Sequence, residues 1–290
     1  MTLRVMVSRH SAFYSPVITA VELLRERGVE VEYSIAKPGQ RSAQLLGSGE
    51  IDIMQSAVSS NWKPMERGES PLPVHFAQIN RRDGFFLVGR RPDAAFEGKS
   101  LEGRRLLADH AFQPMAMLRY AGMVNGLDWS RVHLIDARGP ESMEHAFREG
   151  EGDYVHLQSP AAHSLERDGV GWVARSVGAS MPEVAFSSLC CSSAFIGSHR
   201  YDAFMSAYRE ARGWVRTAAP LEAARREADF FPSARIDAIA GAIAAYQSIG
   251  CWGGDVGIPR DLYEQALTVF DSGGLIARRH PYEEVCMEPS

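Results

Sequence analysis

Excess positive charge is one of several features that this 290-residue sequence lacks. It holds 31 lysines and arginines against 36 aspartates and glutamates, which gives a formal net charge of −5 at pH 7. A protein that binds nucleic acid through its phosphates needs a basic surface. The sequence therefore predicts that nucleic acid is not a partner.

Cysteine is scarce, and its spacing carries no motif. The four cysteines stand at positions 190, 191, 251 and 286, without a C-x-x-C pair. Adjacent cysteines such as Cys190 and Cys191 seldom bond to each other because disulfide geometry disfavours it. No disulfide framework is expected, and four free thiols are typical of a reducing compartment. Pairing that involves Cys251 or Cys286 is left open.

Motifs for metals and nucleotide cofactors are also missing. The nine histidines include no H-x-x-x-H pair, and none has the spacing to a cysteine that a zinc site requires. There is no G-x-G-x-x-G fingerprint and no Walker loop. We therefore expect no metal and no cofactor.

Long apolar stretches are absent as well. No segment approaches the roughly 18 apolar residues of a membrane-spanning helix, so membrane insertion is not expected. The first residues, MTLRVMVSRHSAFYSP, do not read as a signal peptide, because two arginines interrupt the short apolar run and no cleavage pattern follows. As written, the sequence predicts a cytoplasmic protein; a trimmed mature form would be periplasmic.

What the sequence does contain is one order of elements, written twice. The strand-like LRVMV, an aromatic turn, a helix through VITAVELLRERG and the strand-like VEVEYSI begin the first unit. RRLLA, the turn DHAFQP, a helix through MAMLRYAGMVNG and RVHLIDA begin the second. Alternating strands and helices predict an α/β fold with two mainly parallel sheets.

The correspondence between the two units extends to single residues. Gly49-Glu50-Ile51-Asp52 matches Gly150-Glu151-Gly152-Asp153, and a Gln-Ser pair follows each, Gln55-Ser56 and Gln158-Ser159. Duplication of one unit is one interpretation. The other is the ordinary similarity of any two strand–helix–strand units.

Polar and aromatic side chains gather in the turns that follow four of these strands, at residues 8–15, 55–60, 109–114 and 156–160. Ligands of α/β sheets bind beyond the carboxyl ends of the strands, so two lobes that face each other with these edges would enclose a cleft. The candidate ligand-binding residues are Arg9, His10, Ser11, Phe13, Tyr14, Gln55, Ser56, Ser59, Asp109, His110, Phe112, Gln113, His156, Gln158 and Ser159.

The first turn and its counterpart offer charge and flat surfaces. Arg9 and His10 suit a contact to an acidic or heteroaromatic ligand, although a solvated turn with one internal salt bridge would use them equally. Phe13, Tyr14 and Phe112 suit stacking on a flat ligand or, alternatively, packing between helices.

The second turn offers an acid and a base. Asp109 stands where an N-terminal helix cap is common. His110 would form a pair able to relay protons if it faced His10 across the cleft. The glutamine and serine side chains of the remaining turns suit neutral polar recognition, or plain turn chemistry.

Three segments of the chain carry a family resemblance: GSGEIDIMQSAVSS, FEGKSLEGRRLLAD and IPRDLYEQALTVFDSGGLIARRHPYEEV. They resemble the periplasmic substrate-binding proteins of ABC importers, in the branch for sulfonates, nitrate and thiamine-pyrimidine precursors. The resemblance covers most of the chain. It implies a two-lobed type II fold, in which each lobe is a mainly parallel sheet flanked by helices and the C-terminal region is helical.

On this resemblance, residues 1–88 and 198–290 would form a first, discontinuous lobe, and residues 89–197 would form a second, with the ligand cleft between them. The expected function is that of a small-molecule-binding protein. It would close by hinge motion on a small planar ligand, acidic or heteroaromatic. An ABC permease would be a partner if the protein is exported.

Cytosolic relatives of the fold supply the alternative, because they are enzymes. They include a sulfinate desulfinase, a dihydroxyphthalate decarboxylase and the yeast-type thiamine-pyrimidine synthase. On this interpretation His10, His110 and His156 would serve as acid and base in a lyase-type reaction. The desulfinase uses a cysteine in the first turn, where this chain has Ser8 and Ser11.

Overall fold

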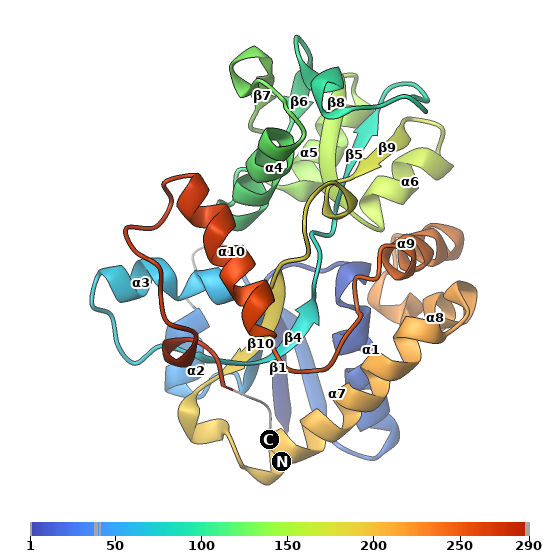
Figure 1. Cartoon of the computed structure of the whole chain (residues 1–290). Helices are drawn as coiled ribbons and strands as arrows, with labels where there is room; N and C mark the ends of the chain where they lie inside the picture. Colours follow the sequence, from blue (N-terminus) through green and yellow to red (C-terminus); the bar gives the residue numbers. More distant parts are fainter. Residues whose placement is uncertain (1, 38–39, 41, 288–290) are drawn as a thin grey trace.

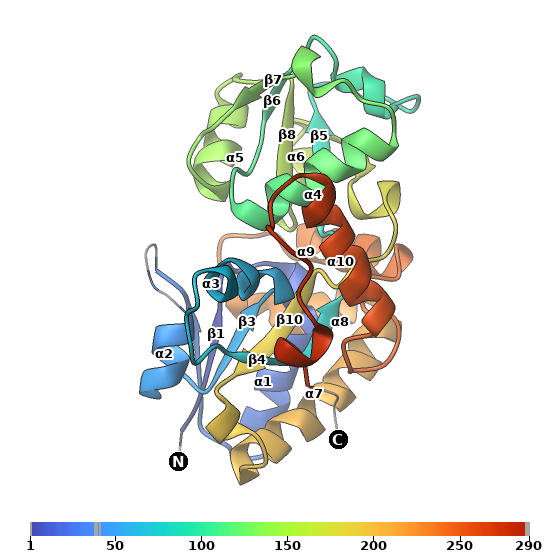
Figure 2. The ribbon, with the colours of Figure 1, turned by 60° about the vertical axis from the view of Figure 1, so that its left-hand side comes forward.

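Two lobes stand one above the other in the structure, a computed structural model that describes residues 2–37, 40 and 42–287 (Figure 1). Each lobe is built on its own five-stranded sheet. Helices flank both sheets, and a 60° turn of the molecule shows the lobes as separate bodies joined at a waist (Figure 2). The two-lobed α/β architecture expected from the sequence is confirmed.

The first sheet has the strand order β2-β1-β3-β10-β4, and β10 runs antiparallel to both of its neighbours. The strands are β1 (Leu3–Val7), β2 (Val31–Ile35), β3 (Ile53–Ser56), β4 (Val74–Asn80) and β10 (Ser187–Cys191). The pairs of β1 with β2 and β3 are parallel, as strand–helix–strand units require.

The second sheet repeats this topology with the order β7-β6-β8-β5-β9. Its strands are β5 (Phe85–Gly89), β6 (Arg105–Leu107), β7 (His133–Ile135), β8 (Tyr154–Gln158) and β9 (Trp172–Ser176). Here β5 is the antiparallel strand, between β8 and β9. Each sheet therefore takes its antiparallel strand from a chain segment that adjoins a crossing between the lobes.

The same ion pair occupies the same place in both sheets. Asp52, directly before β3, accepts a hydrogen bond from the backbone N–H of Arg4 (2.8 Å) and pairs with its guanidinium (3.0 Å). Asp153, directly before β8, accepts from the backbone N–H of Arg105 (2.8 Å) and pairs with its guanidinium (3.3 Å). A shared topology and a shared side-chain role favour duplication over ordinary similarity.

The chain crosses between the lobes twice, over residues 81–84 and over residues 177–186. These crossings differ from the boundaries expected at 88 and 198. The segment FFLVG is strand β5 of the second sheet, where all five of its residues are buried between β8 and β9. Likewise SSLCC is strand β10 of the first sheet.

The helices follow the strands in the expected order, and the region after β10 is helical. They are α1 (Ser15–Glu26), α2 (Ser42–Ser48), α3 (Trp62–Glu66), α4 (Phe112–Val124), α5 (Pro140–Arg148), α6 (Ala161–Arg167), α7 (His199–Thr217), α8 (Pro220–Glu227), α9 (Ile236–Ser248) and α10 (Arg260–Ser272). Within the described ranges, no helix has the length and apolar character needed to cross a membrane.

Helix α1 shows how the sequence determines where an element begins, which face it buries and where it ends. Pro16 lies in its first turn, where a missing N–H costs no hydrogen bond. Val17, Val21 and Leu24 then face the core at helical spacing. Gly28, at a φ of 77°, adopts the left-handed conformation that follows many helices. The helix therefore starts directly after the first aromatic turn and holds that turn at the sheet edge.

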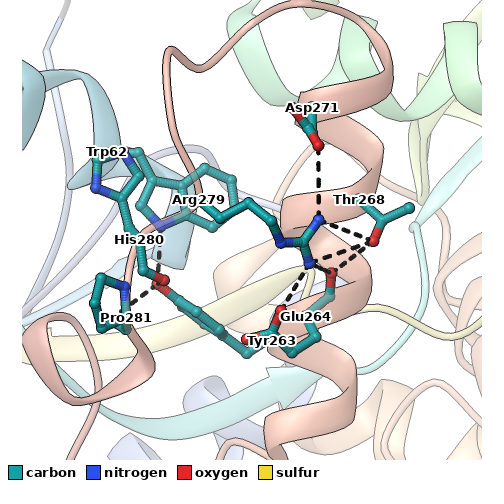
Figure 3. A network of polar contacts seen from close by, with 8 residues as sticks. All are labelled: Trp62, Tyr263, Glu264, Thr268, Asp271, Arg279, His280 and Pro281. Atoms are coloured by element: carbon teal, nitrogen blue, oxygen red, sulfur yellow. Dashed lines mark hydrogen bonds and ion pairs between the residues drawn. The ribbon is translucent and has the colours of Figure 1, made fainter.

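The segment that follows α10 is tied back onto that helix (Figure 3). Arg279 pairs with the carboxylate of Glu264 at 2.7 Å. The Tyr263 hydroxyl donates to the carbonyl of His280 (3.0 Å) and accepts from the indole N–H of Trp62 on α3 (3.1 Å). These contacts fix α10 in the position where it also reaches α4 of the second lobe.

Candidate ligand-binding cleft

A cavity of about 310 Å³ lies between the two lobes. Its walls come from all four turns at the strand ends, from Phe186 of the return crossing, and from the strand residues next to the crossings, Phe85 of β5 and Ser187 of β10. The residues that line it are Ser8, Arg9, Tyr14, Gln55, Ser56, Ala57, Ser59, Ser60, Phe85, Ala111, Phe112, Gln113, Pro114, Gln158, Phe186 and Ser187. Because each lobe supplies part of the wall, relative motion of the lobes would open or close the cavity.

Eight of the fifteen candidate residues line this cavity: Arg9, Tyr14, Gln55, Ser56, Ser59, Phe112, Gln113 and Gln158. The other seven lie elsewhere, and their contacts explain why. They are His10, Ser11, Phe13, Asp109, His110, His156 and Ser159.

Arg9 and Asp109 form an ion pair across the cleft. Nη1 of Arg9 lies 2.5 Å from Oδ2 of Asp109, and Oδ1 of Asp109 accepts from the Ala111 N–H (2.8 Å) at the start of α4. Burial raises the pKa of Asp109, but the Arg9 charge and these hydrogen bonds outweigh burial, so its pKa lies below the usual value. The carboxylate is therefore ionised at neutral pH, and the pair is neutral as a whole.

The guanidinium of Arg9 also sits over an aromatic ring. Its carbon lies 5.5 Å from the centroid of Phe85, the first residue of β5. Phe85 and Phe186 stand at the two crossings, with ring centroids 6.5 Å apart. Together they give the cavity an apolar wall where the chain passes between the two lobes.

Gln55 and Gln158 end corresponding strands but differ in their hydrogen bonds. Oε1 of Gln55 accepts from the N–H (3.0 Å) and the hydroxyl (2.6 Å) of Ser8, and its Nε2 donates to the Ser56 carbonyl (3.1 Å). Gln158 is only 8% exposed, and its Oε1 has no hydrogen-bond partner within the described part of the chain. The Gln55 amide is therefore hydrogen-bonded at both its oxygen and its nitrogen, whereas Gln158 carries a free buried acceptor.

Tyr14 places a hydroxyl among these amides. Its side chain is almost fully buried and lines the cavity. Burial raises the pKa of Tyr14, while the charge of Arg9 and hydrogen bonds with Ser187, Gln158 and Ser8 oppose that rise. The hydroxyl is therefore a neutral donor and acceptor at physiological pH.

His10 turns away from the cleft and does not face His110. Its Nδ1 lies 3.0 Å from the Tyr33 hydroxyl, its Nε2 lies 2.6 Å from the Phe230 carbonyl oxygen, and its ring packs on Phe231. Burial lowers the pKa of His10, against the effect of the Phe230 hydrogen bond. Both ring nitrogens are thus occupied by protein groups.

His110 and His156 are in opposite environments. Nδ1 of His110 lies 2.9 Å from the Ala108 carbonyl oxygen, and its ring is exposed. His156 is completely buried, stacks on Phe85 at 4.2 Å, and has no partner for either nitrogen among the described residues. Burial lowers the pKa of His156 to about 3, helped by Arg9 and opposed by Asp109. The three histidines therefore form no relay.

Phe13 belongs to the core rather than to the cavity. Its ring has no exposed surface and packs against Phe186 and Tyr246 at 5.4 Å and 5.2 Å. A Cβ placed on Gly84 would collide with the ring, so the first crossing passes directly over it. The packing alternative for this aromatic residue is the one that the structure adopts.

Several of the turn residues bridge the two lobes. The Ser11 hydroxyl donates to the Ser159 carbonyl at 2.7 Å. The Ser59 hydroxyl donates to Oε1 of Gln113 at 2.5 Å. With the Arg9 ion pair, these contacts join the two lobes across the cleft.

The sequence patterns did not select Phe85, Phe186 and Ser187, which lie in the return crossing or directly next to a crossing. None of the three belongs to the four turns on which the prediction was based. The available signal was the pair of aromatic residues at the start of FFLVG, directly after the polar stretch RRDG.

A larger cavity of about 490 Å³ lies within the second lobe, beside Phe96, Leu118 and Trp129. Its walls come from that lobe and the return crossing, so closure of the lobes would not bury a ligand there. Within the part of the chain that the structure describes, no three His, Cys, Asp or Glu side chains are grouped to hold a metal ion. The cleft is therefore the candidate site.

Two lobes of identical strand order with a cavity between them define a type II periplasmic-binding-protein fold, and comparison with solved structures confirms it. The ligand-binding component of an ABC-type import system from Staphylococcus aureus, solved with zinc bound, matches with a TM-score of 0.77 and 12% identity over 99% of this chain and 97% of that one. The alkanesulfonate-binding protein SsuA from Xanthomonas axonopodis pv. citri, bound to MOPS, matches with a TM-score of 0.73 and 13% identity over 99% and 98%.

Sequence comparison adds a relative from Bacillus subtilis (strain 168), described as "Putative binding protein YtlA". It is 24% identical over 283 residues, which are 95% of this chain and 84% of that protein. No protein-family model matches the chain.

Proposed function

We propose that the protein binds one small planar molecule in the cleft and closes on it by hinge motion. The observation that carries this proposal is the cavity of about 310 Å³ walled by both lobes. That volume is near the lower end of the roughly 300–1,000 Å³ typical of ligand pockets, so the ligand is small. The two crossings supply the hinge.

The walls favour a ring as the core of the ligand. Phe85, Phe112, Phe186 and Tyr14 offer aromatic surfaces from both lobes and both crossings. Amide and hydroxyl groups stand between these rings and can meet polar atoms at the ring edge. An acidic or heteroaromatic planar molecule is the ligand class proposed here.

A role in transport fits the relatives of the fold. The neighbours from Staphylococcus aureus and Xanthomonas axonopodis are binding proteins by their names, and the first belongs to an ABC-type import system. We propose an ABC permease as the partner of the closed form, in a protein that is exported to meet it.

A lyase-type reaction that uses three histidines is less well supported. His10 has both ring nitrogens occupied, and His110 lies on an exposed turn with the Ala108 carbonyl. Burial keeps His156 neutral over the whole physiological range, because its pKa is lowered to about 3. Acid–base catalysis needs a group that titrates near the working pH and reaches the substrate.

Native mass spectrometry of the purified protein, followed by denaturing extraction, tests the proposal. We expect a small aromatic or heteroaromatic molecule to be released and to rebind unchanged. Ala57→Trp, which fills the cleft cavity, should abolish retention. Ala95→Trp, which fills the larger cavity of the second lobe, is the matched control and should not.

Two results would contradict the proposal. Chemical alteration of the released molecule by fresh protein would indicate an enzyme. Retention that is lost in Ala95→Trp but kept in Ala57→Trp would place the ligand in the second lobe instead of the cleft.

A further inference from the structure

The charges and hydrogen-bonding groups of the cleft restrict the chemistry of the ligand more narrowly than the shape of the cavity does. The inference drawn from them rests on the function proposed above. Among the described residues that line the cavity, Arg9 alone has a charged side chain. Its charge is already balanced by Asp109 at 2.5 Å, and the side chain of Asp109 is only 6% exposed. An anionic ligand that captured Arg9 would leave a buried carboxylate without its partner, which is strongly unfavourable.

A second carboxyl group lies close to this pair. Asp83, in the first crossing, is completely buried; its Oδ1 accepts from the Phe85 N–H at 2.6 Å, and its Oδ2 has no partner within the described residues. Asp83 interacts electrostatically with both Arg9 and Asp109. Burial raises the pKa of Asp83 to about 8, so this carboxyl is neutral at physiological pH and Asp109 is the carboxylate that balances Arg9. The described lining of the cleft therefore offers an anion no unbalanced positive charge.

The unpartnered Oε1 of Gln158 indicates that the cleft leaves one hydrogen-bond acceptor for the ligand. A buried amide oxygen without a hydrogen bond is costly, and a ligand that donates to it recovers that cost. The Gln55 oxygen needs no such donor, because the N–H and the hydroxyl of Ser8 already donate to it. The Tyr14 hydroxyl lies beside Gln158 and can accept or donate at the same edge of the ligand.

We infer that the ligand is an uncharged planar molecule that donates an amide-type N–H to Oε1 of Gln158. Carboxylates, sulfonates and nitrate are excluded as ligands, although the chain shares its fold with an alkanesulfonate-binding protein. Of the acidic and heteroaromatic ligands allowed by the proposed function, only uncharged heteroaromatic or aromatic molecules then remain. Gln158 is the residue that determines this specificity.

Three probes of equal size test the inference. Benzamide is neutral and has N–H donors, acetophenone is neutral without donors, and benzoate is anionic. Binding to the intact protein is measured by ligand-observed NMR titration, with Ala57→Trp as the cleft-blocked reference. Benzamide should bind at least about tenfold more tightly than either of the other probes, a difference expected for one recovered buried hydrogen bond.

A glutamine outside the cleft supplies the matched control. Gln158→Met should abolish the preference for benzamide. Gln265→Met, the same change at a residue of α10 that does not line the cavity, should preserve it. Gln158→Glu keeps an acceptor at this position, so it should still bind benzamide and should reject benzoate more strongly.

Three outcomes would overturn the inference. They are equal or tighter binding of benzoate in the cleft, a preference for benzamide that survives Gln158→Met, and the absence of saturable binding by all three probes. The first two leave the proposed function intact, because a ring still binds between the lobes. If none of the three probes binds, the inference fails, and the proposed function is then tested separately by identifying the molecule extracted from the native protein.

Discussion

Asp83 makes the free energy of unfolding depend on pH in a direction opposite to that of most carboxylates. Burial raises its pKa to about 8, against the smaller effects of the Phe85 N–H and Arg9. Between the usual aspartate pKa of 3.8 and pH 8, the folded state keeps a proton that the unfolded state has lost. Stability therefore falls as the pH rises through this window, by up to about 1.4 kcal/mol per pH unit.

Asp83→Asn, which cannot ionise, should remove this slope. Relative to the wild type, the variant should gain stability between pH 5 and pH 8, as measured by urea unfolding at several pH values. Asp109→Asn is the matched control with the opposite sign. The lowered pKa of Asp109 contributes stability above pH 3.8 that is lost on acidification, so this variant should be weakened at neutral pH. Identical pH dependence of Asp83→Asn and the wild type would show that Asp83 is not held neutral.

At the residue scale, the sequence does not predict which side chains of a turn face the cleft. The pattern locates the end of a strand, but a turn can point a side chain to either side. Arg9 enters the cleft, whereas His10, its neighbour, binds Tyr33 and Phe230. Phe13 is drawn into the core because the crossing at Gly84 covers it. Packing between segments far apart in sequence sets these directions.

The two crossings are joined by ion pairs of Arg81 and Arg82 with Glu183, and they pack most closely at Gly178. A Cβ added at Gly178 would lie closer to the backbone carbonyl oxygen of Asp83 than real Cβ atoms come to any neighbour. Gly178→Ala must therefore push the crossings apart. We expect a loss of about 1–3 kcal/mol in the free energy of unfolding, as for other overpacked sites, measured by urea denaturation.

Gly213→Ala is the control for this change. Gly213 lies inside α7, and a methyl group added there would meet no atom within 4 Å, so the substitution adds helix propensity without a clash. It should stabilise the protein by about 0.4–1 kcal/mol. Equal effects of the two substitutions would mean that the crossings are not tightly packed at Gly178.

At the scale of elements, the sequence predicted the repeated units well, because alternation and the Gly-Glu-x-Asp pattern are local. The Asp52 and Asp153 ion pairs show that this pattern has one structural role in both copies. The membership of β5 and β10 was not predictable in the same way. Each strand joins a sheet whose other strands lie far away in the chain, and only pairing decides which sheet that is.

At the scale of the whole molecule, the hinge motion proposed above would make the contacts between the lobes decide how often the cleft is open. Such contacts join Arg9 with Asp109, Ser11 with Ser159, and Ser59 with Gln113. A ligand shifts this equilibrium only by the difference in its affinity for the open and closed forms. Contacts that hold the empty protein closed therefore compete with recognition of the ligand.

Arg9→Gln should shift the ligand-free protein toward the open form. A hydrogen bond to a charged group contributes about 1.5–3 kcal/mol, so its loss changes the ratio of open to closed molecules by roughly ten- to 150-fold. Small-angle X-ray scattering should show a larger radius of gyration for the variant than for the wild type.

Arg4→Gln removes a guanidinium from a carboxylate within one lobe, at the Asp52 pair, and should leave the radius of gyration unchanged. If Arg9→Gln also leaves it unchanged, the remaining contacts between the lobes are sufficient to hold them, and Arg9 serves the cleft rather than its closure.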